Sequence, residues 1–97
     1  MKRTRNAKYR LNVRRQPCLI CGAQADDAHH LRFAQDRGMG LKVSDHFCVP
    51  LCRGHHRENH TWGAEKTWWA LHGVDPVAWA ENNWKAFCDA AEREDET

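Results

Sequence analysis

The stretch Cys52-Arg-Gly-His-His-Arg-Glu-Asn-His60 decides how this chain folds, because it places one thiol and three imidazoles within nine residues. In a helix, residues three or four positions apart share a face. Cys52 and His55 then form one pair of metal-type ligands. His56 and His60 form a second pair that points in another direction. Because the two pairs of ligands point in different directions from the helix, they predict two separate metal sites in one domain.

The first pair has its partners upstream, in Gln16-Pro-Cys-Leu-Ile-Cys-Gly22. A Cys-x-x-Cys turn followed by glycine points backbone amides at two sulfurs, as in a zinc knuckle. A redox motif shares this spacing, but the redox interpretation expects a βαβ context that the chain does not supply. An odd number of cysteines, five, also argues against a pure disulfide framework. The spacing predicts a closed structural zinc site formed by Cys18, Cys21, Cys52 and His55.

The second pair has candidate partners in His29 and His30. Residues 26–33 read as a short strand, in which neighbours point to opposite faces. An isolated His-His pair is usually an ordinary surface feature, but here a second histidine cluster follows it. His29, His56 and His60 are therefore predicted to bind one divalent ion with open coordination positions. His30 stays free to deprotonate an attacking water near neutral pH.

The rest of the chain predicts a small α+β domain. Cys48 reads as a small buried hydrophobe, and most of the aromatic residues read as core. Gly73 fits a helix C-cap, and Asp75-Pro76 fits a helix start. We expect a loop over 34–45, a strand over 46–51 and helices over 52–60, 64–72 and 76–92. The expected aromatic core consists of Trp68, Trp69, Trp79, Trp84 and Phe87.

Charge is distributed unevenly along a chain of 97 residues with a net charge of +2. Seven of the fifteen lysines and arginines precede Gln16, and no acid lies among them. We expect residues 1–16 to form a basic, lightly packed arm that binds a polyanion such as nucleic acid. A solvated flexible terminus explains the arm equally well. Within it, Tyr9, Leu11 and Val13 alternate as in a short edge strand. Residues 94–97 form an acidic tail.

The composition also excludes some classes of protein. No apolar run approaches the ~18–20 residues of a membrane span, and no apolar segment follows the basic N-terminus as in a secretory signal. We therefore expect a cytoplasmic protein with reduced thiols, which favours metal binding by clustered cysteines. A domain of this size buries little apolar surface, so a bound metal ion would add stability that the hydrophobic core alone does not supply.

Taken together, the motifs resemble the HNH (His-Me finger) endonucleases, and most closely a small phage- and prophage-associated branch. Cys-x-x-Cys, His-His and Pro-Leu-Cys-x-x-His-His carry this resemblance, which covers roughly residues 17–85. It implies a ββα-metal fold with a structural zinc and extra C-terminal helices, within a nuclease domain over 17–93. By this likeness His30 is the general base, whereas His29, His56 and His60 hold the catalytic ion. Cys18, Cys21, Cys52 and His55 fall on the structural zinc ligands.

The pattern departs from that family in two places. Asp45 stands nearest to the position of the middle Asn, and we expect it to orient the loop that carries the base by accepting loop amide bonds. His55 stands where many relatives have cysteine, so an exchange of roles between His55 and His56 stays open. Arg57 lies next to the expected site and is a candidate to steady phosphate charge, with a surface salt bridge as the alternative. Arg32, Arg37 and Lys42 are further phosphate candidates.

The resulting hypothesis is an endonuclease that hydrolyses phosphodiester bonds of DNA, with a structural Zn2+ and one catalytic Mg2+, Mn2+, Ni2+ or Zn2+ ion. Two alternatives are a non-catalytic, zinc-stabilised nucleic-acid-binding module and a partner-dependent accessory subunit of a phage DNA-processing complex. His30 discriminates between catalysis and binding alone, because a binding module does not need a free imidazole beside three ligands. RNA as the substrate and the oligomeric state stay open.

Overall fold

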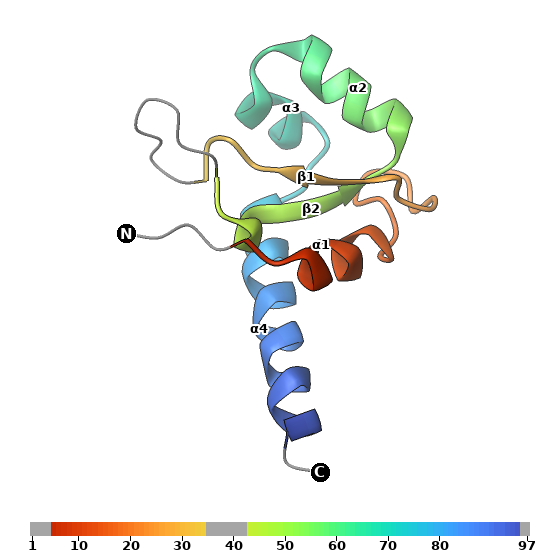
Figure 1. Ribbon diagram of the computed structural model, residues 1–97. Coiled ribbons are helices and arrows are strands. Elements are labelled where there is room, and N and C mark those ends of the chain that lie inside the picture. Colours follow the sequence, from red (N-terminus) through yellow and green to blue (C-terminus); the bar gives the residue numbers. More distant parts are fainter. Residues whose placement is uncertain (1–4, 35–42, 96–97) are drawn as a thin grey trace.

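The computed structural model describes residues 5–34 and 43–95 and contains a small α+β fold (Figure 1). A two-stranded antiparallel sheet lies at its centre, with Asp27 of β1 paired to Leu51 of β2 and His30 paired to Cys48. The elements are α1 (Ala7–Arg14), β1 (Asp27–His30), the 3-10 turn η1 (Asp45–Phe47), β2 (Cys48–Leu51), α2 (Arg53–Trp62), α3 (Glu65–Leu71) and α4 (Pro76–Asp95).

The helices lie on both sides of the sheet. In Figure 1, α2 and α3 lie above the two strands, and α1 and α4 lie below them. Contacts of α1 with both strands and of α2 with both strands agree with this arrangement. Because neighbouring strand residues face opposite sides, β1 turns one of its two histidines toward α2 and the other toward α1.

Two apolar clusters hold these layers together. On the side of α3, Trp68 and Trp69 are buried against Leu31, Val49 and Leu51. On the side of α1, a second cluster forms around Tyr9, Val13 and Cys48. Burying one large apolar side chain contributes roughly 1.5–3 kcal/mol, so both clusters matter in a chain of this size. Trp79, Trp84 and Phe87 are partly buried against these clusters, as expected of core aromatics.

The N-terminal segment differs from our expectation of a lightly packed arm or edge strand. Residues 7–14 form helix α1, and the side chain of Asn6 caps it by accepting a hydrogen bond from the Tyr9 amide at 3.0 Å. Tyr9 and Val13 alternate with Leu11, but they also stand four residues apart and therefore share one helical face. That face is fully buried, whereas Leu11 on the other face is 38% exposed. The three-residue alternation was too short to distinguish the two periods.

The remaining elements follow the predicted order with shifted ends. The strand expected over 46–51 begins at Cys48, because residues 45–47 form η1. Gly63 and Gly73 adopt positive φ values of 86° and 67° after α2 and α3. Asp75 Oδ1 accepts from the Ala78 amide at 3.1 Å and so caps α4. Residues 94 and 95 belong to α4 rather than to a separate tail.

Two further expectations concern parts of the chain that are not described. Most of the expected loop over 34–45, with Arg37 and Lys42, lies outside the described residues, as do residues 96 and 97. In the described part of the chain, no helix combines the length and the apolar character needed to cross a membrane.

Candidate metal centres and an acid–base pair

Three cysteines and one histidine come together where the Cys18–Cys21 turn meets the start of α2. The ligand atoms of Cys18, Cys21, Cys52 and His55 all lie within 4.8 Å of one another. His55 Nδ1 lies 3.3 Å from Cys52 Sγ and 3.8 Å from Cys18 Sγ, and Cys21 Sγ lies 3.9 Å from Cys52 Sγ. A tetrahedral zinc ion with bonds of ~2.0–2.3 Å separates its ligands by about 3.5–3.8 Å. This cluster can therefore hold a metal such as zinc.

Thiol ionisation in this cluster also fits a cation. Burial would raise the pKa of the Cys18 thiol, but backbone amides of Cys52, Cys21 and Ile20 outweigh burial and lower it to about 6. At Cys52 a backbone hydrogen bond from His55 lowers the pKa, but desolvation and the sulfurs of Cys21 and Cys18 outweigh it and raise the pKa. The turn thus favours the thiolate form of Cys18, whereas the neighbouring sulfurs disfavour a second thiolate at Cys52. A bound cation would offset the repulsion between the two negative charges.

Three imidazoles form a second group between β1 and α2. The ligand atoms of His29, His56 and His60 lie within 4.8 Å of one another. His56 Nε2 and His60 Nε2 are 3.1 Å apart, close to the ~3.3 Å that two nitrogens take up on one tetrahedral ion. Desolvation, followed by the neighbouring His56 and His29, lowers the pKa of His60. A lowered pKa keeps the imidazole neutral, as metal ligation requires.

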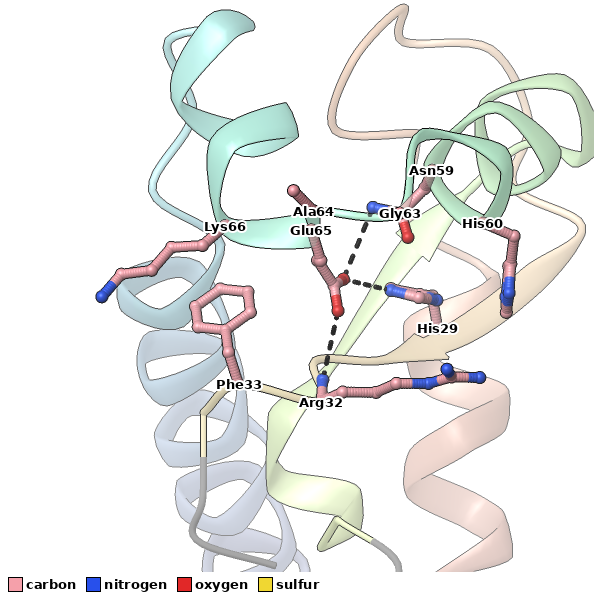
Figure 2. A pocket seen from close by; sticks show the side chains of 9 residues that line it. All are labelled: His29, Arg32, Phe33, Asn59, His60, Gly63, Ala64, Glu65 and Lys66. Carbon is pink, nitrogen blue, oxygen red and sulfur yellow. Dashed lines mark hydrogen bonds and ion pairs between the residues drawn. The ribbon is translucent and has the colours of Figure 1, made fainter.

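Carboxylates fix the orientation of two of these three rings. Asp27 Oδ2 accepts a hydrogen bond from His56 Nδ1 at 2.9 Å, which leaves His56 Nε2 facing His60. Glu65 Oε2 accepts from His29 Nε2 (Figure 2), which leaves His29 Nδ1 as its lone-pair atom. A carboxylate on the second ring nitrogen is the usual companion of a metal-bound histidine. The group can therefore offer three ring nitrogens to one ion and leave other coordination positions open.

Glu65 is a site residue that sequence reasoning missed. It begins α3, 36 positions after His29, and no motif spacing connects the two. Its carboxylate also accepts from Trp69 Nε1 at 3.1 Å and from the Arg32 amide at 3.3 Å. Burial would raise the pKa of Glu65, but the hydrogen bond and charge of His29 outweigh it and lower the pKa. Its place in the first turn of a helix was the sole signal, and that position is common for acids.

His30 and Asp45 form an acid–base pair on the other face of β1. His30 Nε2 donates to Asp45 Oδ1 at 2.8 Å, and the His30 side chain is 36% exposed whereas Asp45 is buried. Burial would raise the pKa of Asp45, but the Asn6 amide, His30 and Arg10 outweigh it and lower the pKa. An ionised carboxylate at Nε2 fixes the tautomer, so that the lone pair of His30 lies on Nδ1.

Asp45 has partners that we did not expect. Among the described residues, which leave out most of the expected loop, its partners besides His30 belong to the N-terminal segment. The Asn6 amide donates to Asp45 Oδ2 at 2.7 Å, and Arg5 and Arg10 form ion pairs with the same carboxylate. Two of the cations that we assigned to nucleic-acid binding therefore pair with this buried charge, although their side chains stay 40% and 39% exposed.

Arg57 lines a hollow with Glu58, Thr61 and Trp62, and none of the three imidazoles lines that hollow. Arg32 instead lines the hollow that contains His29 and His60.

His55 and His56 take separate places. His55 Nδ1 faces the cysteine sulfurs, whereas His56 faces His60 and Asp27. The geometry thus groups His55 with the three cysteines and His56 with the other two imidazoles. Cys48 lies near His30 and Asp45, but burial raises the pKa of its thiol to about 12. A thiol that stays protonated behaves as a small buried hydrophobe, as predicted.

Comparison with known proteins places the chain in a family. A family described as "Protein of unknown function (DUF968)" matches residues 1–88. The chain belongs to this DUF968 family. It is also 54% identical over 54 residues to the "Uncharacterized protein YdfU" of Escherichia coli (strain K12). That match covers 56% of the chain and 16% of the relative, so the chain spans a small part of that protein's length. No solved structure matches the chain significantly.

Proposed function

We propose that the domain is a metal-dependent endonuclease of the HNH type that hydrolyses phosphodiester bonds of DNA. One observation carries the proposal: adjacent residues of β1 turn His29 toward two more imidazoles and His30 toward the buried Asp45. Three ligands with open positions, beside a histidine oriented by a carboxylate, are the parts that metal-assisted hydrolysis requires. A module that only binds nucleic acid needs neither a third imidazole nor an oriented base.

The order of the elements supports the same proposal. Strands β1 and β2 pair antiparallel, and α2 follows directly with His56 and His60 on the face that meets His29. This is the order that a ββα-metal domain requires. The cluster of Cys18, Cys21, Cys52 and His55 would hold a structural zinc beside it. The helices α3 and α4 would then be additions that complete the core.

In this mechanism His30 accepts a proton. Its Nε2 hydrogen is engaged by Asp45, so Nδ1 takes the proton from water while the water oxygen forms a bond to phosphorus and the P–O bond to the leaving oxygen breaks. Asp45 stabilises the imidazolium that results. A divalent ion at His29, His56 and His60 would polarise the phosphate and offset the charge on the leaving oxygen. The leaving oxygen then takes a proton from solvent.

Plasmid nicking tests the proposal directly. Purified chain would be incubated with supercoiled plasmid and Mg2+, Mn2+, Ni2+ or Zn2+, or with EDTA, alongside His30→Ala and the matched control His72→Ala. We expect metal-dependent nicking by wild type and His72→Ala and none by His30→Ala at unchanged zinc content. If His30→Ala nicks at the wild-type rate, His30 is not the base. If no protein cuts with any metal but all bind DNA, the domain is a binding module or requires a partner.

A further inference from the structure

A hollow of about 390 Å³ adjoins the imidazole group and is lined by His29, His60, Arg32, Phe33, Glu65 and Lys66, with Asn59, Gly63 and Ala64 (Figure 2). Its volume falls within the ~300–1,000 Å³ of small-molecule sites. The hollow is polar on the side of the imidazoles and apolar where Phe33 lies. It therefore offers different surfaces to different parts of one ligand.

Charge in the hollow favours an anion. Figure 2 shows the Arg32 side chain extended beneath His29 and His60, and Lys66 on the opposite side of Glu65. The one acid of this lining, Glu65, is turned inward, because its carboxylate accepts from His29, Trp69, Asn59 and the Arg32 amide. The negative charge of Glu65 is thus compensated by donors within the protein, whereas the side chains of Arg32 and Lys66 are exposed to solvent. A phosphodiester complements this arrangement.

Phe33 adds a feature that phosphate binding alone does not use. Its ring is 36% exposed, although Leu31, two residues earlier on the same segment, is fully buried. Figure 2 shows the ring standing beside Glu65, on the side away from His29. In proteins that bind single strands, exposed aromatic rings within a positively charged groove are surfaces on which nucleobases stack. In duplex DNA the faces of the bases are covered by their neighbours, so only an unpaired base can reach such a ring.

From these observations we infer that the hollow binds one unpaired nucleotide of a DNA strand, with its base on Phe33 and its flanking phosphates at Arg32 on one side and at Lys66 on the other. The domain would then act on single-stranded or frayed DNA in preference to duplex. This inference rests on the proposed nuclease function, because it places the neighbouring phosphate at the imidazole group. It adds a substrate class that the site residues alone do not specify.

Binding measurements separate this inference from cleavage. Fluorescence anisotropy would give the Kd of a labelled single-stranded oligothymidylate and of a blunt-ended G·C-rich duplex without loops, in a His30→Ala background so that neither is cut. We compare Phe33→Ala, Phe33→Leu, Phe33→Trp and the matched control Trp62→Ala, whose exposed indole lies in the hollow on the other half of α2. Thermal unfolding of each variant establishes that it is folded.

We expect Phe33→Ala and Phe33→Leu to weaken binding of the single strand about fivefold or more, because the stacking surface is lost. Duplex binding should stay unchanged, and Phe33→Trp should restore wild-type affinity. Equal losses for single strand and duplex, or no loss in Phe33→Leu, would overturn the inference. These results do not depend on cleavage. Nicking without a Phe33 effect refutes only this inference, whereas a Phe33 effect in a wild-type protein that cleaves neither plasmid nor the single strand argues only against the nuclease.

Discussion

Asp45 Oδ1 lies 2.8 Å from His30 Nε2, and the carboxylate that makes this contact is fully buried. Replacing Asp45 by Asn keeps the shape but removes the charge that stabilises a protonated His30. General-base catalysis is worth ~10²–10⁴-fold, so we expect Asp45→Asn to slow plasmid nicking by about 10²-fold or more. Nicking rates, with circular dichroism as a control for folding, measure this. Nicking at the wild-type rate would contradict the role of Asp45.

The same carboxylate predicts a pH-dependent stability. Its folded-state pKa is lowered, so its stabilising contribution is complete above its unfolded-state pKa, near ~3.9. That contribution is lost as the pH falls through the lower folded-state value. The difference in unfolding free energy between wild type and Asp45→Asn should therefore shrink below about pH 4. Urea unfolding at pH 7 to pH 3 tests this, since protonation of the cysteine cluster affects both proteins alike. A constant difference would contradict it.

Removal of the cysteine cluster should unfold the domain. Structural zinc contributes an apparent ~10–16 kcal/mol in small zinc domains, which is comparable with or larger than the ~5–15 kcal/mol by which whole domains are stable. We expect Cys18→Ser and Cys52→Ser to lose one equivalent of zinc together with their helical circular dichroism. Cys88→Ser, outside the cluster, serves as the matched control. Folded, metal-free Cys18→Ser protein would show that the cluster is not a structural zinc site.

The two carboxylates behind the imidazole group should tune its affinity. Removing the acid that orients a metal-bound histidine typically weakens binding ~10–100-fold. We expect this loss for Asp27→Asn and for Glu65→Gln, measured by titration with Ni2+ on zinc-loaded protein. Glu81→Gln, an exposed acid on α4, is the matched control. Wild-type Ni2+ affinity in both carboxylate variants would show that they do not support a metal site.

Helix α1 should act in both stability and nucleic-acid binding. Val13→Ala truncates a fully buried side chain of α1 that packs against the sheet. We expect this change to lower the free energy of unfolding by about 1–3 kcal/mol, measured by urea unfolding.

Arg14 and Arg15, at the end of α1, are exposed and line hollows there. Arg14→Gln with Arg15→Gln should leave stability nearly unchanged and reduce the salt dependence of DNA binding by about one unit per lost phosphate contact. An unchanged salt slope would exclude these arginines as phosphate contacts.

Short-range spacing carried most of what the sequence could predict. The Cys-x-x-Cys turn and the helical offsets between Cys52 and His60 define which donors share a face, and the described structure brings those donors together. Contacts between residues that lie far apart in the sequence cannot be predicted from local spacing. Glu65 meets His29 across 36 positions and Arg10 meets Asp45 across 35. Whether a charged residue pairs with a buried partner depends on packing that no local period encodes, which is also why the local pattern of residues 1–16 does not predict α1.

The neighbours His55 and His56 belong to different donor groups but share the first turn of α2. Ordering that turn for the cysteine cluster therefore also orders His56, and with it His60 one turn later. An ion at one group should thus raise the affinity of the other group for its own ion, and thermodynamic linkage makes this effect reciprocal. The domain would load its two metals cooperatively, so that a chain lacking structural zinc also lacks a competent imidazole site.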